Sequence, residues 1–257
     1  MPSDRLYVYL ATGCFFGGFL FALQTLRSGP ARKSWANLTV MGMGFLLQCV
    51  FLAQRGRAVR QCPLTNTFEL LVFVAWCLVL LYFLIGATYR WSLLGLFTAP
   101  LVFLLQLMAL WAPDTPPAVI SPVNFWNELH KSVSLLSYGA FALACVAGVM
   151  FLIQDRQLKR RKLDKWFFQL PPIHYLHQTI RRLNLFGFVL LTVGIIAAFR
   201  MERSNPGHNL TPVYLIWAIY GSMVTYDFTR GMSARKGAIA SVLAFLAPLV
   251  TLWIFAH

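Results

Sequence analysis

One histidine stands at the edge of a predicted membrane helix, beside two aromatic residues. His130 ends a short amphipathic segment that begins at Asn124, and an apolar run from 132 to 153 follows directly. The run is about long enough to cross a bilayer, so His130 should lie where water meets lipid, with Phe125 and Trp126 about one turn before it. An imidazole among aromatic rings at that depth could ligate a heme iron. It could equally be an interfacial side chain that hydrogen-bonds water or lipid, and the residue types leave both readings open.

No other group of residues predicts catalysis or a structural metal. The five cysteines form no C-x-x-C pair, and four of them lie inside apolar runs, as small buried hydrophobes do. His174 and His177 are three residues apart and could share a helical face, but no third ligand lies near them. No nucleophile and base stand together. We therefore expect no catalytic residues and a protein that is not an enzyme.

The composition is that of a membrane protein. Of the 257 residues, 58% are hydrophobic and only 12% are charged, whereas a soluble domain carries roughly a quarter charged residues. The net charge of +14 is more simply explained by basic cytoplasmic loops than by nucleic-acid binding. Long continuous apolar runs favour helices over a membrane barrel, which would show alternation.

Eight apolar runs predict an all-α, polytopic helical bundle that forms a single membrane domain over residues 1–257. The expected helices cover residues 6–26, 35–54, 67–88, 91–111, 132–153, 184–200, 212–228 and 237–256. The first run is too long for a signal-peptide core, so we expect a membrane helix there. Two acidic residues, Glu69 and Asp227, lie near the ends of apolar runs, so we expect water to hydrate their side chains.

The basic residues predict an orientation. Fifteen of the 22 Lys and Arg residues lie in the first, third, fifth and seventh connections, and seven lie on the other side. Positive charge marks the cytoplasmic side, so both chain ends and His130 should face outward. The fifth connection, 154–183, should be cytoplasmic, form a surface helix and bind anionic lipid through its basic run.

Several segments, in order along the chain, resemble the cytochrome c assembly family of membrane proteins, of the CcsA/ResC type and closer to its short HemX-like members. Residues 62–69, CPLTNTFE, resemble the family's Pro-Leu-x-Asn-x-x-Glu motif, and residues 126–141, WNELHKSVSLLSYGAF, resemble its Trp, His and Ser-Tyr pattern. Residues 170–197 resemble its amphipathic lead-in and Gly-Phe-x-Leu-Leu-Thr helix, and residues 217–237 its penultimate helix and basic turn. The resemblance covers most of the chain from about residue 40.

The resemblance implies a role and also marks departures from the family's pattern. The family handles heme at the outer membrane face, so His130 matches an axial ligand, with Trp126 and Phe125 covering the porphyrin. The family's Trp-rich loop corresponds to residues 200–211, RMERSNPGHNLT, which contain no tryptophan. His208 stands in that loop and is the candidate second ligand, and Arg200 or Arg203 could pair with propionates. Gln48 lies near the place of the family's inner histidine.

These observations predict a heme-handling protein of the cytoplasmic (inner) membrane that assists cytochrome c assembly. Heme b is the expected cofactor. Other cytochrome c assembly proteins and apocytochrome c are the expected partners, with no nucleic acid. The alternative is a structural or regulatory membrane subunit without heme that acts through its basic loop. A transporter is disfavoured by the few ionisable residues within the runs and the lack of visible inverted repeats.

Overall fold

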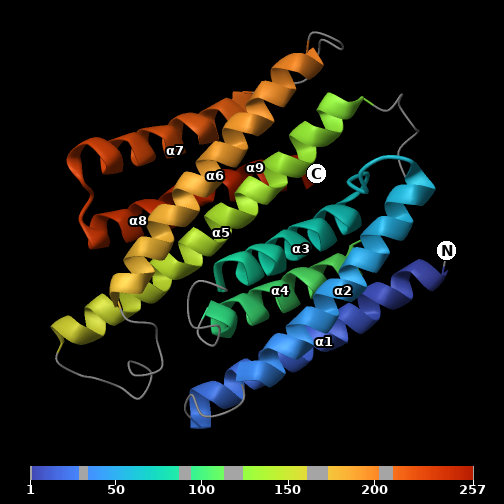
Figure 1. The fold of residues 1–257 in the computed structure, drawn as a ribbon, viewed down its shortest axis with the longest axis horizontal. Coiled ribbons are helices and arrows are strands. Elements are labelled where there is room, and N and C mark those ends of the chain that lie inside the picture. Colours follow the sequence, from blue (N-terminus) through green and yellow to red (C-terminus); the bar gives the residue numbers. More distant parts are fainter. Residues whose placement is uncertain are drawn as a thin grey trace. The chain divides into compact units, whose positions relative to one another are not determined.

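Helices make up nearly all of the chain that the structure describes. The computed structural model describes residues 2–28, 34–86, 94–112, 124–160, 173–202 and 211–256, and within these ranges it contains no strand. The helices in these ranges (Figure 1) are α1 Pro2–Ser28, α2 Ser34–Val59, α3 Thr67–Gly86, α4 Leu94–Trp111, α5 Phe125–Lys159, α6 Ile173–Glu202, α7 Thr211–Arg230, α8 Ala234–Ala244 and α9 Leu246–Ala256.

The predicted all-α, multi-pass membrane fold is confirmed. Among the described residues, six helical segments are long and apolar enough to cross a membrane, and they lie in α1, α2, α3, α5, α6 and the α8–α9 pair. The apolar part described for α4, Thr98–Trp111, is shorter. Crossing by α4 and α7, and with it the count of eight, stays a prediction. Helices α8 and α9 meet at Phe245, close before Pro248, whose missing N–H cannot continue a helical ladder.

The chain divides into two compact units, Met1–Val123 and Asn124–His257. In the first unit, α1 packs on α2 and α4, and α3 packs on α4 and α2. One layer of its core combines a side chain from each helix with Phe68 at the start of α3: Val8, Phe51, Val72 and Ala109. Each of these is nearly or fully buried, as expected of helices that share one apolar centre.

A buried ion pair fixes the corner between α2 and α3. The Glu69 side chain is fully buried, and its carboxylate accepts hydrogen bonds from the Arg55 guanidinium at 2.5 Å and from the backbone and hydroxyl of Thr65 at 2.8 and 2.7 Å. The Asn66 side chain caps α3 by accepting the Glu69 N–H at 2.8 Å. The expectation that Glu69 is wet was therefore wrong, because Arg55 and Thr65 replace the water around its charge.

Small residues let α5 and α6 pack closely over most of their length in the second unit (Figure 1). The glycines of α6, Gly187 and Gly194, are seven residues apart, and so are the α5 residues that they face, Phe141 and Ser134. A Cβ at Gly187 would lie 2.5 Å from the Phe141 ring, and one at Gly194 would lie 2.7 Å from the Ser134 hydroxyl. This spacing is typical of a close antiparallel helix seam, and we call it the α5–α6 seam.

We expect Gly187→Ala to lower the free energy of unfolding by about 1–3 kcal/mol, as overpacking of a tight core does. The Phe141 ring cannot yield, because it is fully buried and stacks on Tyr220 of α7 with ring centroids 3.5 Å apart. Gly194→Ala is the matched control, since the Ser134 hydroxyl can rotate away from the new methyl group. Unfolding in mild detergent measures both, and equal costs would contradict this account of the seam.

The turn between α7 and α8 ties this part of the second unit to the start of α6. Asp227 pairs with Arg181 of α6 at 2.6 Å, and it also accepts the Met232 N–H at 3.0 Å. Gly231 has φ +69° and so turns the chain where a side chain would be strained. Asn184 of α6 donates to Ser241 of α8 at 2.7 Å. These contacts hold α6, α7 and α8 together at one end.

The connection 154–183 differs from its prediction at both edges. Residues 154–159 are the end of α5, and residues 173–183 are the first turns of α6, continuous with the apolar part of that helix. The described residues of the connection therefore form no separate surface helix, because they continue α5 and α6. Residues 161–172 lie outside the described ranges. The side of the membrane on which the connection lies stays a prediction.

Candidate functional site

The candidate site lies where α5 begins. Asn124 caps the helix, and its side chain accepts the Trp126 N–H at 3.0 Å. The helix then runs unbroken to Lys159, a length of roughly 50 Å at 1.5 Å per residue. That exceeds the hydrocarbon thickness of about 30 Å. The uncharged stretch between Lys131 and Asp155 fits the hydrocarbon, which leaves Trp126 and His130 at its edge.

The His130 ring is held in one orientation by α6. Its Nδ1 lies 2.8 Å from the backbone carbonyl oxygen of Gly194 and 3.4 Å from the Ser134 hydroxyl. A carbonyl only accepts hydrogen bonds, so Nδ1 carries the proton and donates it. In the neutral ring, Nε2 then carries the lone pair. Metal-binding histidines commonly show this arrangement, in which the other ring nitrogen donates to a backbone carbonyl.

Gly194 makes this contact possible. Its missing side chain lets α6 come close to α5 at the level of Ser134. The carbonyl of Gly194 lies within an apolar part of α6, and an N–H of His130 reaches it from the neighbouring helix. The seam described above therefore sets the tautomer of His130 as well as the packing of the two helices.

Aromatic and cationic groups lie at the same end of the α5–α6 pair. The guanidinium of Arg200 lies 5.8 Å from the centroid of the Trp126 ring, within the range of a cation–π interaction. The Phe125 and Trp126 rings form a T-shaped pair with centroids 5.5 Å apart. Phe125 is 66% exposed and Trp126 is 37% exposed, so both present ring surface to the surroundings. The structure thus brings Trp126, Phe125 and Arg200 to the end of the pair where His130 lies.

The other predicted site residues lie elsewhere or are not described. His208 and Arg203 lie outside the described residues. His174 and His177 lie near the opposite end of α6, and His174 Nε2 contacts the Gln178 amide at 2.9 Å. The described ranges contain no cluster of three or more His, Cys, Asp or Glu residues that could hold a metal ion. Gln48 is fully buried in α2, and its amide has no hydrogen-bond partner within those ranges.

One partner of His130, the Gly194 carbonyl, was not predicted from the sequence. A backbone carbonyl has no signature in a sequence, and its position depends on the register of α6 against α5. The seven-residue spacing of Gly187 and Gly194 was the available signal, since small residues at that interval favour close helix contact. The Trp126–Arg200 contact depends on the same register.

Comparison with known proteins assigns the chain to a family. Residues 64–256 match the family described as "Cytochrome C assembly protein". The chain is 29% identical to protein HemX of Brevibacillus brevis over 254 residues, which cover 95% of this chain and 91% of that protein. It is 31% identical to the cytochrome c biogenesis protein CcsA of Chlorella vulgaris over 281 residues, covering 93% and 89% of the two chains.

A longer relative gives the same assignment. The chain is 26% identical to the cytochrome c biogenesis protein CcsA of Chlamydomonas reinhardtii over 223 residues, which cover 80% of this chain and 62% of that protein. The matched family range includes α3 and every described helix of the second unit, and with them His130, Gly194 and the capped corner at Glu69. This chain therefore belongs to the cytochrome c assembly protein family.

Proposed function

We propose that this protein handles heme at the outer face of the cytoplasmic (inner) membrane and thereby assists cytochrome c assembly. The observation that carries the proposal is the hydrogen bond from His130 Nδ1 to the Gly194 carbonyl, which places the ring's lone pair on Nε2. Two relatives named for cytochrome c biogenesis support the cellular role. Other cytochrome c assembly proteins and apocytochrome c are the proposed partners, and residues 1–257 are proposed to act as one membrane domain.

The residues at this end of α5 and α6 fit heme b. His130 would supply one axial nitrogen, and the exposed rings of Trp126 and Phe125 would cover porphyrin surface. The guanidinium of Arg200 would pair with a propionate. His208 is proposed as the second ligand. Bound heme would supply the vinyl groups and iron that an assembly partner acts on, while this chain binds and orients them. We propose no catalytic residue here.

The absorbance spectrum of the purified protein tests the proposal. Protein produced with sufficient heme is expected to show a Soret band that remains after gel filtration in mild detergent, because an axial nitrogen holds the iron. A pyridine hemochrome assay identifies the heme type and gives its stoichiometry. Protein without a Soret band under these conditions would overturn the heme assignment.

We expect a reporter fused after His257 to be active outside the cytoplasm. The physical reason is the excess of Lys and Arg in the odd-numbered connections, which favours their retention in the cytoplasm. Alkaline phosphatase, active outside, and green fluorescent protein, fluorescent inside, make a matched pair of reporters. Fluorescence with no phosphatase activity would show that the span count or the orientation is wrong.

A second candidate function is a structural or regulatory membrane subunit without heme. The observation that favours it is the sequence of residues 200–211, which has none of the tryptophans that the resemblance leads one to expect. Such a protein would act through the basic residues between α5 and α6. A stable complex with assembly proteins, isolated without heme under heme-replete expression, would support this role over the first.

A further inference from the structure

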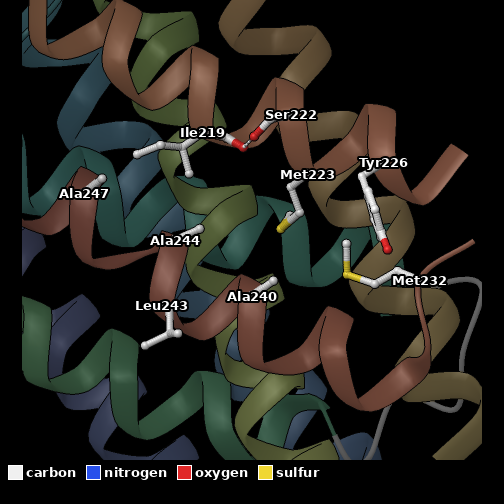
Figure 2. A pocket seen from close by; sticks show the side chains of 9 residues that line it. All are labelled: Ile219, Ser222, Met223, Tyr226, Met232, Ala240, Leu243, Ala244 and Ala247. Atoms are coloured by element: carbon white, nitrogen blue, oxygen red, sulfur yellow. Dashed lines mark hydrogen bonds between the residues drawn. The ribbon is translucent and has the colours of Figure 1, made fainter. Parts of the chain in front are cut away.

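Two adjoining cavities of the second unit lie at the end opposite His130. The first is an apolar groove of about 600 Å³ between α7 and the α8–α9 pair. Figure 2 shows Ile219 and Met223 of α7 facing it from one side, and Ala240 and Ala244 of α8 from the other. The small alanine side chains leave this space open. The groove follows α7 from Ile219 to Tyr226, roughly 10 Å at 1.5 Å per residue.

The second cavity, of about 310 Å³, has a mixed lining that includes charged side chains. It lies where α6 begins and α7 ends, and two arginines, Arg181 and Arg182, line it with one acidic residue, Asp227. Its lining therefore carries a net positive charge, even though Arg181 is paired with Asp227. We call it the basic pocket. It lies at the end of the unit that carries the basic turn after α7, with Arg230, Arg235 and Lys236.

The two cavities adjoin each other. Met223 and Met232 line both of them, and Figure 2 shows the two side chains at the Tyr226 end of the groove. A pocket with cationic groups therefore borders an apolar groove, which follows α7 from Tyr226 to Ile219. A ligand that fills both must have an anionic head and an apolar tail.

A buried polar atom in the basic pocket indicates what the head must offer. Asn184 is 5% exposed, and its Nδ2 donates to Ser241. Its Oδ1 is buried and accepts no hydrogen bond from any residue in the described ranges. Such an acceptor is costly to leave unpaired, so it favours a ligand with a hydroxyl or amine donor. The arginines, which only donate, favour phosphate oxygens in the same ligand.

We propose that the basic pocket and the groove together bind one anionic phospholipid whose headgroup carries hydroxyl donors, with phosphatidylglycerol as the type. Its phosphate lies against Arg181 and Arg182, a headgroup hydroxyl donates to Asn184 Oδ1, and one acyl chain lies along the groove past Met223. Basic pockets between membrane helices bind anionic headgroups in this way. The site is independent of the heme proposal, because it lies at the other end of α6.

Binding of two lipids with identical acyl chains tests the proposal. Native mass spectrometry of the whole protein in mild detergent compares phosphatidylglycerol with phosphatidylcholine. We expect the first to bind at least fivefold more tightly, and Arg182→Gln to weaken its binding about fivefold, the effect of one basic group near a lipid surface. Binding of phosphatidylcholine should not change. Arg57→Gln, an exposed arginine of the first unit, is the matched control and should change neither.

A second variant tests the groove. Ala244→Phe fills the space beside Met223 and should weaken the binding of both lipids. Leu246→Phe, at an exposed position outside the lining, should change the binding of neither lipid. Gel filtration verifies that each variant is folded. If Ala244→Phe does not fold, Arg182→Gln still tests by itself whether the arginines recognise the headgroup. Equal binding of the two lipids, or no effect of Arg182→Gln, would overturn the proposal.

Competition with inorganic phosphate and with hemin tests whether the site binds a free anion or a porphyrin instead of a lipid. If phosphate displaces phosphatidylglycerol and Ala244→Phe has no effect on the lipid, the pocket binds a free anion and the lipid proposal is wrong. If hemin displaces the lipid from the wild type with the same dependence on Arg182 and Ala244, the site binds a porphyrin instead. Neither ligand should displace the lipid at concentrations near that of the protein.

Discussion

Replacing His130 with alanine is expected to abolish the Soret band of the heme-loaded protein or to shift it strongly. The imidazole is the proposed axial ligand, and the 2.8 Å contact between Nδ1 and the Gly194 carbonyl orients its ring. Alanine removes the nitrogen and leaves the α5–α6 seam in place, because the seam's tightest contacts are made by Gly187 and Gly194. The measurement is the absorbance spectrum of purified protein in its oxidised and reduced forms, per mole of protein.

Histidines at the other end of α6 provide matched controls. His174→Ala and His177→Ala should leave the spectrum unchanged, and His208→Ala should shift it if His208 supplies the second axial nitrogen. Exogenous imidazole should restore heme to His130→Ala, since it replaces the missing ligand without covalent attachment. If His130→Ala leaves the heme spectrum unchanged and His174→Ala abolishes it, both the proposed site and the proposed orientation are wrong.

Arg55→Ala is expected to lower the free energy of unfolding by about 3–5 kcal/mol, the usual cost of leaving one member of a buried ion pair alone. Glu69 is fully buried, so without Arg55 its negative charge keeps, among the described residues, the two hydrogen bonds from Thr65. Urea or thermal unfolding of detergent-solubilised protein gives the difference. Lys159→Ala is the control, since Lys159 is 57% exposed in its pair with Asp155. Its loss should cost less than about 1 kcal/mol.

The double variant Arg55→Ala, Glu69→Gln tests the cause of this loss. If the unpaired charge is what destabilises Arg55→Ala, removing the charge as well should recover part of the lost stability. A double variant that is less stable than Arg55→Ala would show instead that packing of the arginine stem dominates. An Arg55→Ala variant as stable as Lys159→Ala would contradict the buried ion pair.

The fold class could be predicted from the sequence, because a membrane permits few kinds of spanning structure. Long apolar runs must form helices in lipid, where each backbone group needs a partner within the chain. The prediction that His130 lies at the membrane edge rests on the same reasoning, since the charge of Lys131 ends the apolar run. Helix boundaries were less well predicted. The lead-in at 175–183 joins α6 because no proline or glycine separates it from the apolar residues that follow.

Contacts between helices could not be predicted in the same way. Arg55 and Glu69 are fourteen residues apart, and only the turn between α2 and α3 brings their charges together. The hydrogen bond from His130 to Gly194 joins residues 64 positions apart. Periodicity shows which face of a helix is apolar, but it leaves the neighbour and the register open. The group that orients the His130 ring was therefore missed, and the role of His130 as a ligand stays a proposal.

The α5–α6 seam has a mechanical consequence. Helix α6 is unbroken from Ile173 to Glu202, and its glycines hold it so close to α5 that the two helices form a stiff rod. His177, beside the basic pocket, and Gly194, beside His130, are roughly 25 Å apart along that rod at 1.5 Å per residue. When the rod tilts about its middle, its two ends swing in opposite directions. A lipid bound at the proposed site would oppose this tilting about the middle, because the tilting requires that end to move.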